Sequence, residues 1–345
     1  MHKERLTIVI STYNRCSRLK ANLDKLLSYS EKRIRFLVGN NASTDGTAAY
    51  LEALVSDRLR VIHGTENNGF ENFWLLAFAV STEYFLFLND RDSMDEKNLT
   101  EICDLLEAIK PCEIISCERG FWKGGYLNPA AFTDPFFFSR HPGTLIYAAA
   151  YCKCYLSREQ VLHYIQRQKQ NLFNIYLDCT LLGNLRRGYA YKKYLISQPK
   201  DRDMMKQERK DYYGCSYITP EYRLHEFDDW AEELGKEHRR GIENIFLSMI
   251  KNALFTLTYE FYYSIQSEDF VARNNCRGYK KNDWYGNGKN YIRHVLNSEI
   301  VKELKMENKV KRIYAQNIWR FFFGLGLNRL AEIKNGLFKK WRGFS

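Results

Sequence analysis

The first ninety residues repeat one pattern, in which an apolar segment is followed by a polar loop and then by an amphipathic helix. In the first helix, one face carries Leu19, Leu23, Leu26 and Leu27. Strands that alternate with helices of this length form βαβ units, whose crossovers are right-handed and whose sheet is mainly parallel. The pattern therefore predicts an α/β fold, with strands over residues 6–10, 34–38, 59–62 and 85–88.

Polar clusters follow the first three strands at the point where each strand ends. They occupy residues 11–15, 39–47 and 67–70. In an open α/β sheet, ligands bind just beyond the carboxyl ends of the strands, and a nucleotide is the expected ligand there. We therefore expect the three clusters to lie at one edge of the sheet and to form one site.

The fourth strand ends in two carboxylates, Asp90 and Asp92. A divalent ion such as Mg²⁺ is usually bound by one or two carboxylates together with phosphate oxygens, so this pair suits an ion that holds a diphosphate. A second interpretation stays open, because paired acids at a strand end also act as helix caps or loop charges. Ser93, Asp95 or Glu96 can start the next helix.

Taken in order, four loops resemble the motif series of family 2 glycosyltransferases with the GT-A fold, in particular bacterial enzymes of surface polysaccharide synthesis. The matching segments are Ser11-Thr12-Tyr13-Asn14-Arg15, residues 41–47, Asn67-Asn68-Gly69 and Asp90-x-Asp92. The resemblance covers roughly residues 5–200. It implies a GT-A domain (Rossmann-like, with a mainly parallel sheet), a nucleotide-sugar donor and inversion at the anomeric carbon. It also implies Mn²⁺ or Mg²⁺ as cofactor, bound by Asp90 and Asp92.

By the same resemblance, Thr12 and Tyr13 border the nucleoside. The family usually has an aspartate at the end of the second strand, where this chain has Asn40 and Asn41. An amide still pairs with the imide edge of uracil or thymine, because its oxygen accepts and its nitrogen donates, so a UDP-sugar is the expected donor. Ser43 either contacts the donor or caps a helix. The other expected donor contacts are Asn14, Arg15, Asn68, Gly69, Asn89, Asp90, Arg91 and His141, and a structural role stays open for His141 in its predicted turn.

Asp178 is the candidate base that takes the proton of the attacking hydroxyl. Residues 174–188 resemble the family segment in which a catalytic acid starts a helix that ends at a glycine, here before a strand predicted over residues 191–196. A helix N-terminus favours the ionised carboxylate, which can accept a proton. The family commonly has Glu-Asp where this chain has Leu177-Asp178, and a helix-capping role for Asp178 stays open.

Together these features predict an inverting, metal-assisted hexosyl- or N-acetylhexosaminyltransferase. Its acceptor would be a hydroxyl of a glycan or of a lipid-linked molecule, in the synthesis of surface polysaccharide or glycolipid. The alternative is a catalytically inactive GT-A subunit for binding or assembly, which the departures at Asn40, Asn41 and Leu177 suggest. A nucleotidyltransferase is a more distant interpretation, because residues 11–15 are not a glycine-rich phosphate loop.

The length of 345 residues exceeds the usual size of one domain. We expect a GT-A catalytic domain over residues 1–204 and a helical C-terminal domain over residues 205–345. The pattern becomes helical from Leu224, and one stripe carries Ile242, Ile245, Phe246, Met249, Ile250 and Leu254. Residues 274–290 contain Gly278, Gly286 and Gly288 and are predicted to form a loop.

The tail, about residues 311–345, is basic and rich in aromatic residues. Residues 300–345 hold eleven Lys or Arg and three Glu, so they carry +8 of the formal net charge of +11. Cations interleaved with Trp, Phe and Leu are typical of an amphipathic helix that lies in a membrane surface, and no run approaches the roughly 18 apolar residues of a spanning helix. Peripheral membrane attachment is one interpretation. Core packing by residues 319–323 and a contact within a homo-oligomer are the others.

Nucleic acid is not an expected partner, because the chain has no zinc finger, RNP motif or basic leucine zipper and its charge is concentrated in the tail. The nine cysteines are scattered without paired CxxC spacing, which argues against a zinc site or a disulfide framework. The N-terminus runs into the first strand without a signal-peptide pattern. We therefore expect a cytoplasmic protein that is peripheral on the inner face of the cell membrane.

Overall fold

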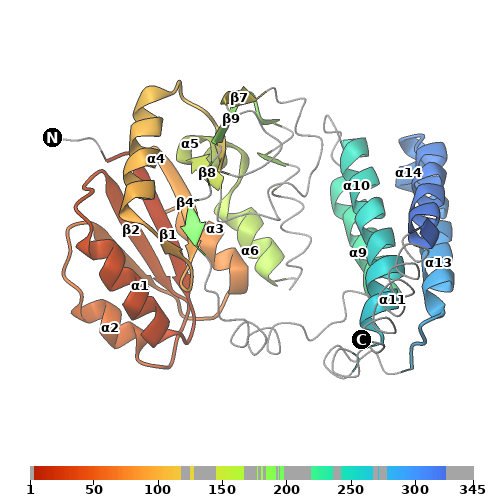
Figure 1. Ribbon diagram of the computed structural model, residues 1–345, viewed down its shortest axis with the longest axis horizontal. Helices are drawn as coiled ribbons and strands as arrows, with labels where there is room; N and C mark the ends of the chain where they lie inside the picture. Colours follow the sequence, from red (N-terminus) through yellow and green to blue (C-terminus); the bar gives the residue numbers. More distant parts are fainter. Residues whose placement is uncertain are drawn as a thin grey trace, which may run out of the picture. The chain divides into compact units, whose positions relative to one another are not determined.

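The computed structural model describes residues 4–117, 125–127, 145–166, 177, 180–181, 184–191, 193, 195–197, 219–235, 242–266, 271 and 278–323. The chain divides into two compact units, Met1–Asp201 and Arg202–Ser345 (Figure 1). The first unit is α/β and the second is helical, as the sequence predicts. None of the helices within the described ranges is long and apolar enough to span a bilayer.

The first unit is built on an eight-stranded sheet with the order β3-β2-β1-β4-β8-β6-β9-β7. The β1–β2, β1–β4, β2–β3 and β6–β9 pairs are parallel, whereas β8 and β7 run antiparallel to their neighbours. The predicted mainly parallel sheet is therefore confirmed. The strands are β1 (Leu6–Thr12), β2 (Ile34–Asn40), β3 (Leu59–His63), β4 (Tyr84–Asn89), β6 (Ile114–Cys117), β7 (Gly125–Leu127), β8 (Leu145–Ala148) and β9 (Gly188–Tyr191).

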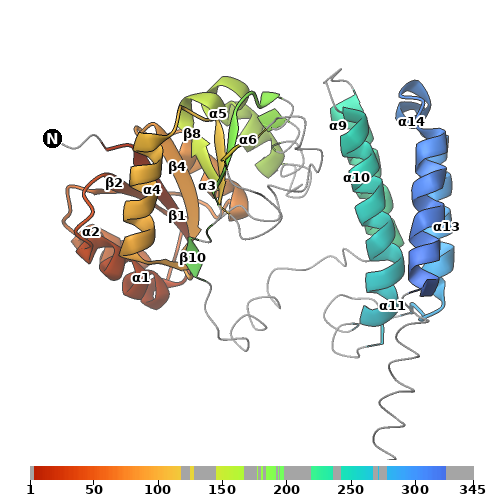
Figure 2. The ribbon, with the colours of Figure 1, turned by 45° about the horizontal axis from the view of Figure 1, so that its top comes forward.

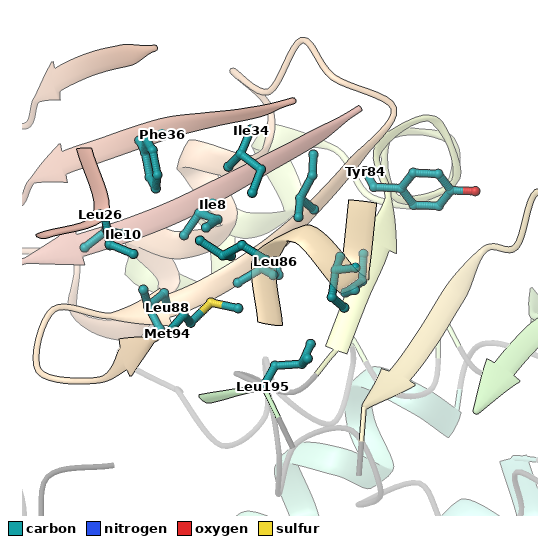
Figure 3. Packing of buried hydrophobic residues seen from close by; sticks show 14 of the residues in the cluster. Ile8, Ile10, Leu26, Ile34, Phe36, Tyr84, Leu86, Leu88, Met94 and Leu195 are labelled. Atoms are coloured by element: carbon teal, nitrogen blue, oxygen red, sulfur yellow. The ribbon is translucent and has the colours of Figure 1, made fainter. Parts of the chain in front are cut away.

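One face of this sheet is covered by α1 (Cys16–Ser28), α2 (Thr47–Ala53) and α4 (Glu96–Ala108) (Figure 1). The strands contribute alternate side chains to the core between the two layers, because successive residues of a strand point to opposite faces. The predicted leucine face of α1 is confirmed for its buried members, Leu19, Leu23 and Leu26. Figure 3 shows part of this core, with the labelled residues Ile8, Ile10, Leu26, Ile34, Phe36, Tyr84, Leu86, Leu88, Met94 and Leu195.

The opposite face carries an aromatic cluster around Trp74 of α3 (Asn72–Ala77), which follows the short helix η1 (Gly69–Glu71). The Trp74 ring lies edge-on to Phe87 of β4, with ring centroids 4.9 Å apart, and to Tyr147 of β8, at 5.3 Å. These rings join the parallel half of the sheet to the mixed half. The same unit contains α5 (Ala149–Tyr155) and α6 (Arg158–Gln166).

Gly39 lets α3 pack closely on β2. A Cβ atom at this position would lie 2.4 Å from Cδ1 of Leu76, which is itself buried. The next residue, Asn40, ends the strand. The contact between Gly39 and Leu76 therefore also positions the end of β2, where the polar loop begins.

The prediction of one strand over residues 191–196 is wrong. β9 is described to Tyr191, which pairs with Cys117 of β6, and residues 193 and 195 are not in a strand. The two-residue strand β10 (Ile196–Ser197) pairs instead with β5 (Ser93–Met94), in antiparallel orientation. Because β5 directly follows Asp92, this small sheet ties a distant part of the chain to the acidic pair.

The second unit is formed by helices (Figure 2). Five residues of the predicted stripe are buried in α10, namely Ile242, Phe246, Met249, Ile250 and Leu254. The helices are α9 (Pro220–Gly235), α10 (Ile242–Phe255), the π-helix η4 (Thr256–Glu260), α11 (Phe261–Ser264), α13 (Asp283–Asn297) and α14 (Glu299–Glu303), and residues 307–323 are also helical.

The prediction of a loop over residues 274–290 is wrong for residues 283–290, because α13 continues through both Gly286 and Gly288. Gly288 is buried, and a Cβ atom there would lie 3.1 Å from Cγ2 of Thr258 in η4. The absence of a side chain at Gly288 therefore allows α13 and η4 to pack closely. Large buried side chains on the same face of α13 outweigh the low helix propensity of glycine.

We expect Gly39→Ala to destabilise the first unit by about 1–3 kcal/mol, the usual cost of overpacking a well-packed core, because the added methyl group must displace Leu76. Gly286→Ala is the matched control. No atom lies within 4 Å of a Cβ atom at that position, so the alanine should stabilise its helix by about 0.5–1 kcal/mol. Urea denaturation measures both changes, and an unchanged midpoint for Gly39→Ala would show that Leu76 yields at no cost.

Candidate active site

The strand register brings the predicted polar clusters to one edge of the sheet. Thr12 at the end of β1 pairs with Asn40 at the end of β2. On the other side of β1, Ser11 pairs with Asn89 at the end of β4. Three parallel strands therefore end side by side, at the edge where α/β sheets bind ligands.

Both carboxylate oxygens of Asp90 have protein partners. Oδ2 accepts a hydrogen bond from Oγ1 of Thr12 at 2.8 Å, and Oδ1 lies 3.0 Å from Nη1 of Arg15. The Asp90 side chain is 1% exposed and that of Arg15 is 29% exposed. The structure thus brings Thr12, Arg15 and Asp90 together in one ion-paired cluster that extends from the core to the solvent.

Asp92 is also buried, but only one of its oxygens has a partner. Oδ2 accepts a hydrogen bond from Nδ2 of Asn89 at 2.7 Å, whereas Oδ1 is buried and receives no hydrogen bond. Burial and the neighbouring charge of Asp90 raise the pKa of Asp92. They outweigh the Asn89 hydrogen bond and the Arg91 charge, which lower it. A buried acceptor without a donor costs about 1–3 kcal/mol, so this oxygen fits a cation as its partner.

Asn22 of α1 holds the backbone of both aspartates. Its Nδ2 donates to the carbonyl oxygen of Asp92 and lies 3.5 Å from that of Asp90. Like Oδ1 of Asp92, its own Oδ1 is buried without a hydrogen-bond partner. Asn22 was not predicted as a site residue, because it is one of several polar residues along α1 and no pattern distinguishes it from the others.

The loops after β1 and β2 are bonded to each other. Asn14 has a left-handed backbone conformation, with φ at 52°, which the short polar side chain of asparagine tolerates. Its backbone N donates to Oγ of Ser43 at 3.0 Å, and its Oδ1 accepts the backbone N of Thr44 at 2.7 Å. Ser43 therefore supports the loop that carries Arg15.

Asp45 ties the starts of two helices together. It accepts hydrogen bonds from the backbone N of Cys16 in α1 at 2.8 Å and from Oγ1 of Thr47 in α2 at 2.5 Å. Burial acts to raise the pKa of Asp45, but these hydrogen bonds outweigh it and the pKa lies below its usual value. The charged form is therefore favoured, and the loop around the site is pinned at both helices.

The amide of Asn40 is buried and bonded within the protein. Its Oδ1 accepts the backbone N of Ser43 at 3.0 Å, and its Nδ2 lies 3.2 Å from Nδ1 of His63. Both polar atoms of the side chain thus have protein partners. The contact with His63 was not expected, since nothing in the sequence of β3 sets this histidine apart.

Asn41 organises the loop that carries Asn67, Asn68 and Gly69. Its Oδ1 accepts the backbone N of Asn68 at 3.0 Å, and its Nδ2 donates to Oδ1 of Asn67 at 2.7 Å. The backbone N of Gly69 also donates to Oδ1 of Asn67, at 3.0 Å. Two motifs of the predicted series are therefore joined through one buried amide.

The remaining predicted residues lie partly outside this cluster. Tyr13 is 42% exposed beside it. His141, the candidate base Asp178 and tail residues 324–345 lie outside the described residues. Over the described part of the chain, no group of three or more His, Cys, Asp and Glu side chains converges as a metal site. An ion here would rely on the aspartates and on phosphate oxygens.

Comparison with known proteins agrees with this geometry. Residues 7–171 match the model of glycosyl transferase family 2. This segment is similar to family 2 glycosyltransferases. No curated protein matches the chain.

Two solved structures share the fold of this chain. S. aureus TarS 1-349 in complex with UDP-GlcNAc has a TM-score of 0.54 and 14% sequence identity, over 92% of this chain and 89% of that chain. The complex of S. aureus TarS 1-349 with UDP has a TM-score of 0.53, with the same identity and coverage. This likeness confirms the predicted GT-A fold.

We expect substitutions of the two aspartates to change stability in opposite directions. Asp92→Asn removes a buried charge whose Oδ1 has no partner, so it should raise the thermal midpoint of the metal-free protein at neutral pH. Asp90→Asn weakens the pair with Arg15 and should lower the midpoint. The loss in free energy of unfolding should be smaller than the loss of about 3–5 kcal/mol that follows when a fully buried ion pair is broken, because Arg15 is partly exposed.

The effect of Asp92→Asn should depend on pH. The folded-state pKa of Asp92 lies above its ordinary value, so the folded wild type binds the proton more readily than the unfolded chain does. The wild type should therefore regain stability relative to Asp92→Asn as the pH falls through the raised pKa. Thermal melts from neutral to acidic pH measure the difference, and a less stable Asp92→Asn at neutral pH would contradict the free-oxygen assignment.

Proposed function

We propose that this protein transfers a hexosyl or N-acetylhexosaminyl unit from a UDP-sugar to a hydroxyl group, with inversion and with the help of a divalent ion. The acceptor in this proposal is a glycan or a lipid-linked molecule in the synthesis of surface polysaccharide or glycolipid. The observation that carries the proposal is the partnerless oxygen of Asp92, buried beside the ion-paired Asp90 at the carboxyl edge of the sheet.

Asp92 is the side chain that would hold Mn²⁺ or Mg²⁺, through Oδ1, with Asp90 beside it. A bound ion supplies Lewis-acid stabilisation of the negative charge on the departing diphosphate. Asn89 fixes the orientation of the Asp92 carboxylate through its other oxygen, and Asn22 holds the backbone of the loop. The protein thereby presents one carboxylate oxygen in a fixed direction, as supporting hydrogen bonds do for metal ligands generally.

For the nucleoside we propose Thr12 and Tyr13, since the exposed ring of Tyr13 offers a surface on which a base can stack. The UDP-GlcNAc and UDP complexes of S. aureus TarS support uracil as the base. To bind the base, the side-chain amide of Asn40 or Asn41 must give up hydrogen bonds that it now makes within the protein and form new ones to the base. The other donor-site residues in this proposal are Asn14, Arg15, Ser43, Asn68, Gly69, Asn89, Asp90, Arg91 and His141.

Asp178 is the base in this proposal, on the strength of the motif resemblance. It takes the proton of the acceptor hydroxyl as that oxygen attacks the anomeric carbon. Attack on the side opposite to the leaving UDP gives inversion in one displacement. No covalent intermediate with the protein is needed.

A donor-hydrolysis assay tests the proposed function. We expect the full chain to release UDP slowly from at least one UDP-sugar when Mn²⁺ is present. Asp92→Ala should reduce this release by about a hundredfold or more, because charge stabilisation of the leaving group is lost. Asp178→Asn should lose transfer but keep Mn²⁺-dependent UDP binding, since the base does not contact the nucleotide.

The matched control in this assay is Asp95→Ala, which removes an exposed carboxylate three residues from Asp92. It should leave the rate of UDP release unchanged. A folded wild type that releases no nucleotide from any of a panel of nucleotide-sugars would contradict the proposal and would favour the inactive binding subunit.

Part of the C-terminal helical segment packs in the core of the second unit. Ile318 and Phe321 contact a cluster that contains Phe261 and Trp284. The Phe321 side chain is 2% exposed, and its ring centroid lies 3.9 Å from that of Trp284. Core packing is therefore observed for one face of residues 307–323.

The exposed aromatic residues of this segment support the proposal of membrane attachment, and the ring of one of them, Phe322, also contacts Trp284 edge-on, with centroids 5.8 Å apart. Trp319, Phe322 and Phe323 are 67%, 57% and 55% exposed, and the rings of Trp319 and Phe323 stack at 5.4 Å. Exposed Arg312 and Arg320 lie on the same helical segment. Exposed aromatic rings together with cations suit an anionic lipid surface, so we propose that the protein lies peripherally on the inner face of the cell membrane.

We expect the triple variant Trp319→Ser, Phe322→Ser and Phe323→Ser to bind anionic liposomes about tenfold or more weakly than the wild type, because three apolar side chains no longer enter the headgroup boundary. Co-sedimentation measures this binding. The control is Val55→Ser, which alters a 98% exposed apolar residue in the first unit and should have no effect. Unchanged liposome binding by the triple variant, with a change in oligomeric state, would assign the aromatic surface to a homo-oligomer contact.

A further inference from the structure

Arg15 occupies the place beside Asp90 that a cation would otherwise take. Its Nη1 lies 3.0 Å from Oδ1 of Asp90, while Thr12 bonds the other oxygen. The neighbouring carboxylate, Asp92, keeps its Oδ1 buried and without a partner. Of the two acidic groups, one is therefore neutralised by a side chain of the protein and the other is poised for an external cation.

The backbone at Arg15 is fixed, whereas its side chain reaches the solvent. The Arg15 carbonyl accepts hydrogen bonds from the backbone N of Arg18 and of Leu19, at 3.1 and 3.0 Å. On either side, Asn14 and Cys16 are bonded to the loop after β2. With 29% of its side chain exposed, Arg15 can turn from one acidic partner to another by rotamer changes alone.

The charges at the edge make such a turn favourable when a donor arrives. Guanidinium groups bind phosphate oxygens through two parallel hydrogen bonds, which are stronger than a single bond to a carboxylate. A divalent ion at Asp92 repels the guanidinium beside Asp90, since both are cations in a largely buried site. A diphosphate that enters with the ion offers Arg15 new acceptors and frees Asp90 for the ion.

We propose that Arg15 is an ionic latch, which holds Asp90 in the donor-free enzyme and moves to the diphosphate when a metal–nucleotide complex binds. The latch makes the ion and the nucleotide bind together, because the ion alone must compete with Arg15 for Asp90. It protects a pair of buried carboxylates from binding stray divalent ions between turnovers. This inference relies on the proposed function only in taking the edge as a metal–nucleotide site.

The test is a calorimetric titration of the full chain with Mn²⁺ alone. Arg15→Gln removes the competing cation and frees Asp90, so it should bind Mn²⁺ alone about tenfold or more tightly than the wild type does. Arg15→Lys keeps a positive charge and should stay within a few fold of the wild type. Lys20→Gln is the matched control, because it removes one exposed charge from α1, the helix that begins directly after Arg15, and should have no effect.

An Arg15→Gln variant that does not bind Mn²⁺ more tightly than the wild type overturns the latch. If Arg15 merely props Asp90 in place, Arg15→Gln loosens the site and binds Mn²⁺ alone as weakly as the wild type or more weakly. A change of the same size in Lys20→Gln also overturns it, since the effect would then come from net charge. Circular dichroism shows whether each variant is folded, and Arg15→Lys gives a second reading should Arg15→Gln fail to fold.

A second titration separates this inference from the proposed function. With Mn²⁺ present, UDP should bind the wild type, and Arg15→Gln should weaken that binding about tenfold or more through loss of charge-assisted hydrogen bonds to phosphate. A wild type that binds UDP with Mn²⁺, together with an Arg15→Gln variant whose affinity for Mn²⁺ alone is unchanged, overturns the latch and leaves the proposed function standing. A wild type that binds no nucleotide overturns both.

Discussion

The in-register parallel pairing of β1 with β2 and with β4 is the constraint on which the candidate active site depends. It ends three strands at one level, so that Thr12, Asn40 and Asn89 become neighbours although they come from separate βαβ units. The hydrogen bond from Thr12 to Asp90 depends on this alignment. A shift of β4 by one residue would turn its alternating side chains to the opposite faces and separate Asp90 from Thr12.

The site keeps a buried charge at a cost to stability. Asp92 is held by Asn89 and by the Asn22 clamp on its backbone, yet one of its oxygens stays without a partner in the protein. Surrounding structure must supply the stability that this arrangement lacks. The leucine-rich layer under α1 and the aromatic cluster around Trp74 lie on the two faces of the same strands and provide it.

The sequence predicted the features that periodicity and order encode. Apolar segments located β1 to β4, helical periodicity located the leucine face of α1 and the stripe of α10, and motif order indicated the family. The clamp by Asn22 and the bonds of Asn41 could not be predicted, because an asparagine side chain carries no periodic signal and its partners lie in distant loops. Glycine misled the prediction at residues 283–290, since a glycine required for close helix packing resembles one required for a turn.

The measurement that tests this account most directly is a calorimetric titration of the full chain with UDP, in the presence and in the absence of Mn²⁺, beside GDP and ADP. UDP should bind when Mn²⁺ is present, much more weakly when it is absent, and more tightly than the other two nucleotides. Equal binding of UDP with and without Mn²⁺, or no binding of any nucleotide, would contradict it.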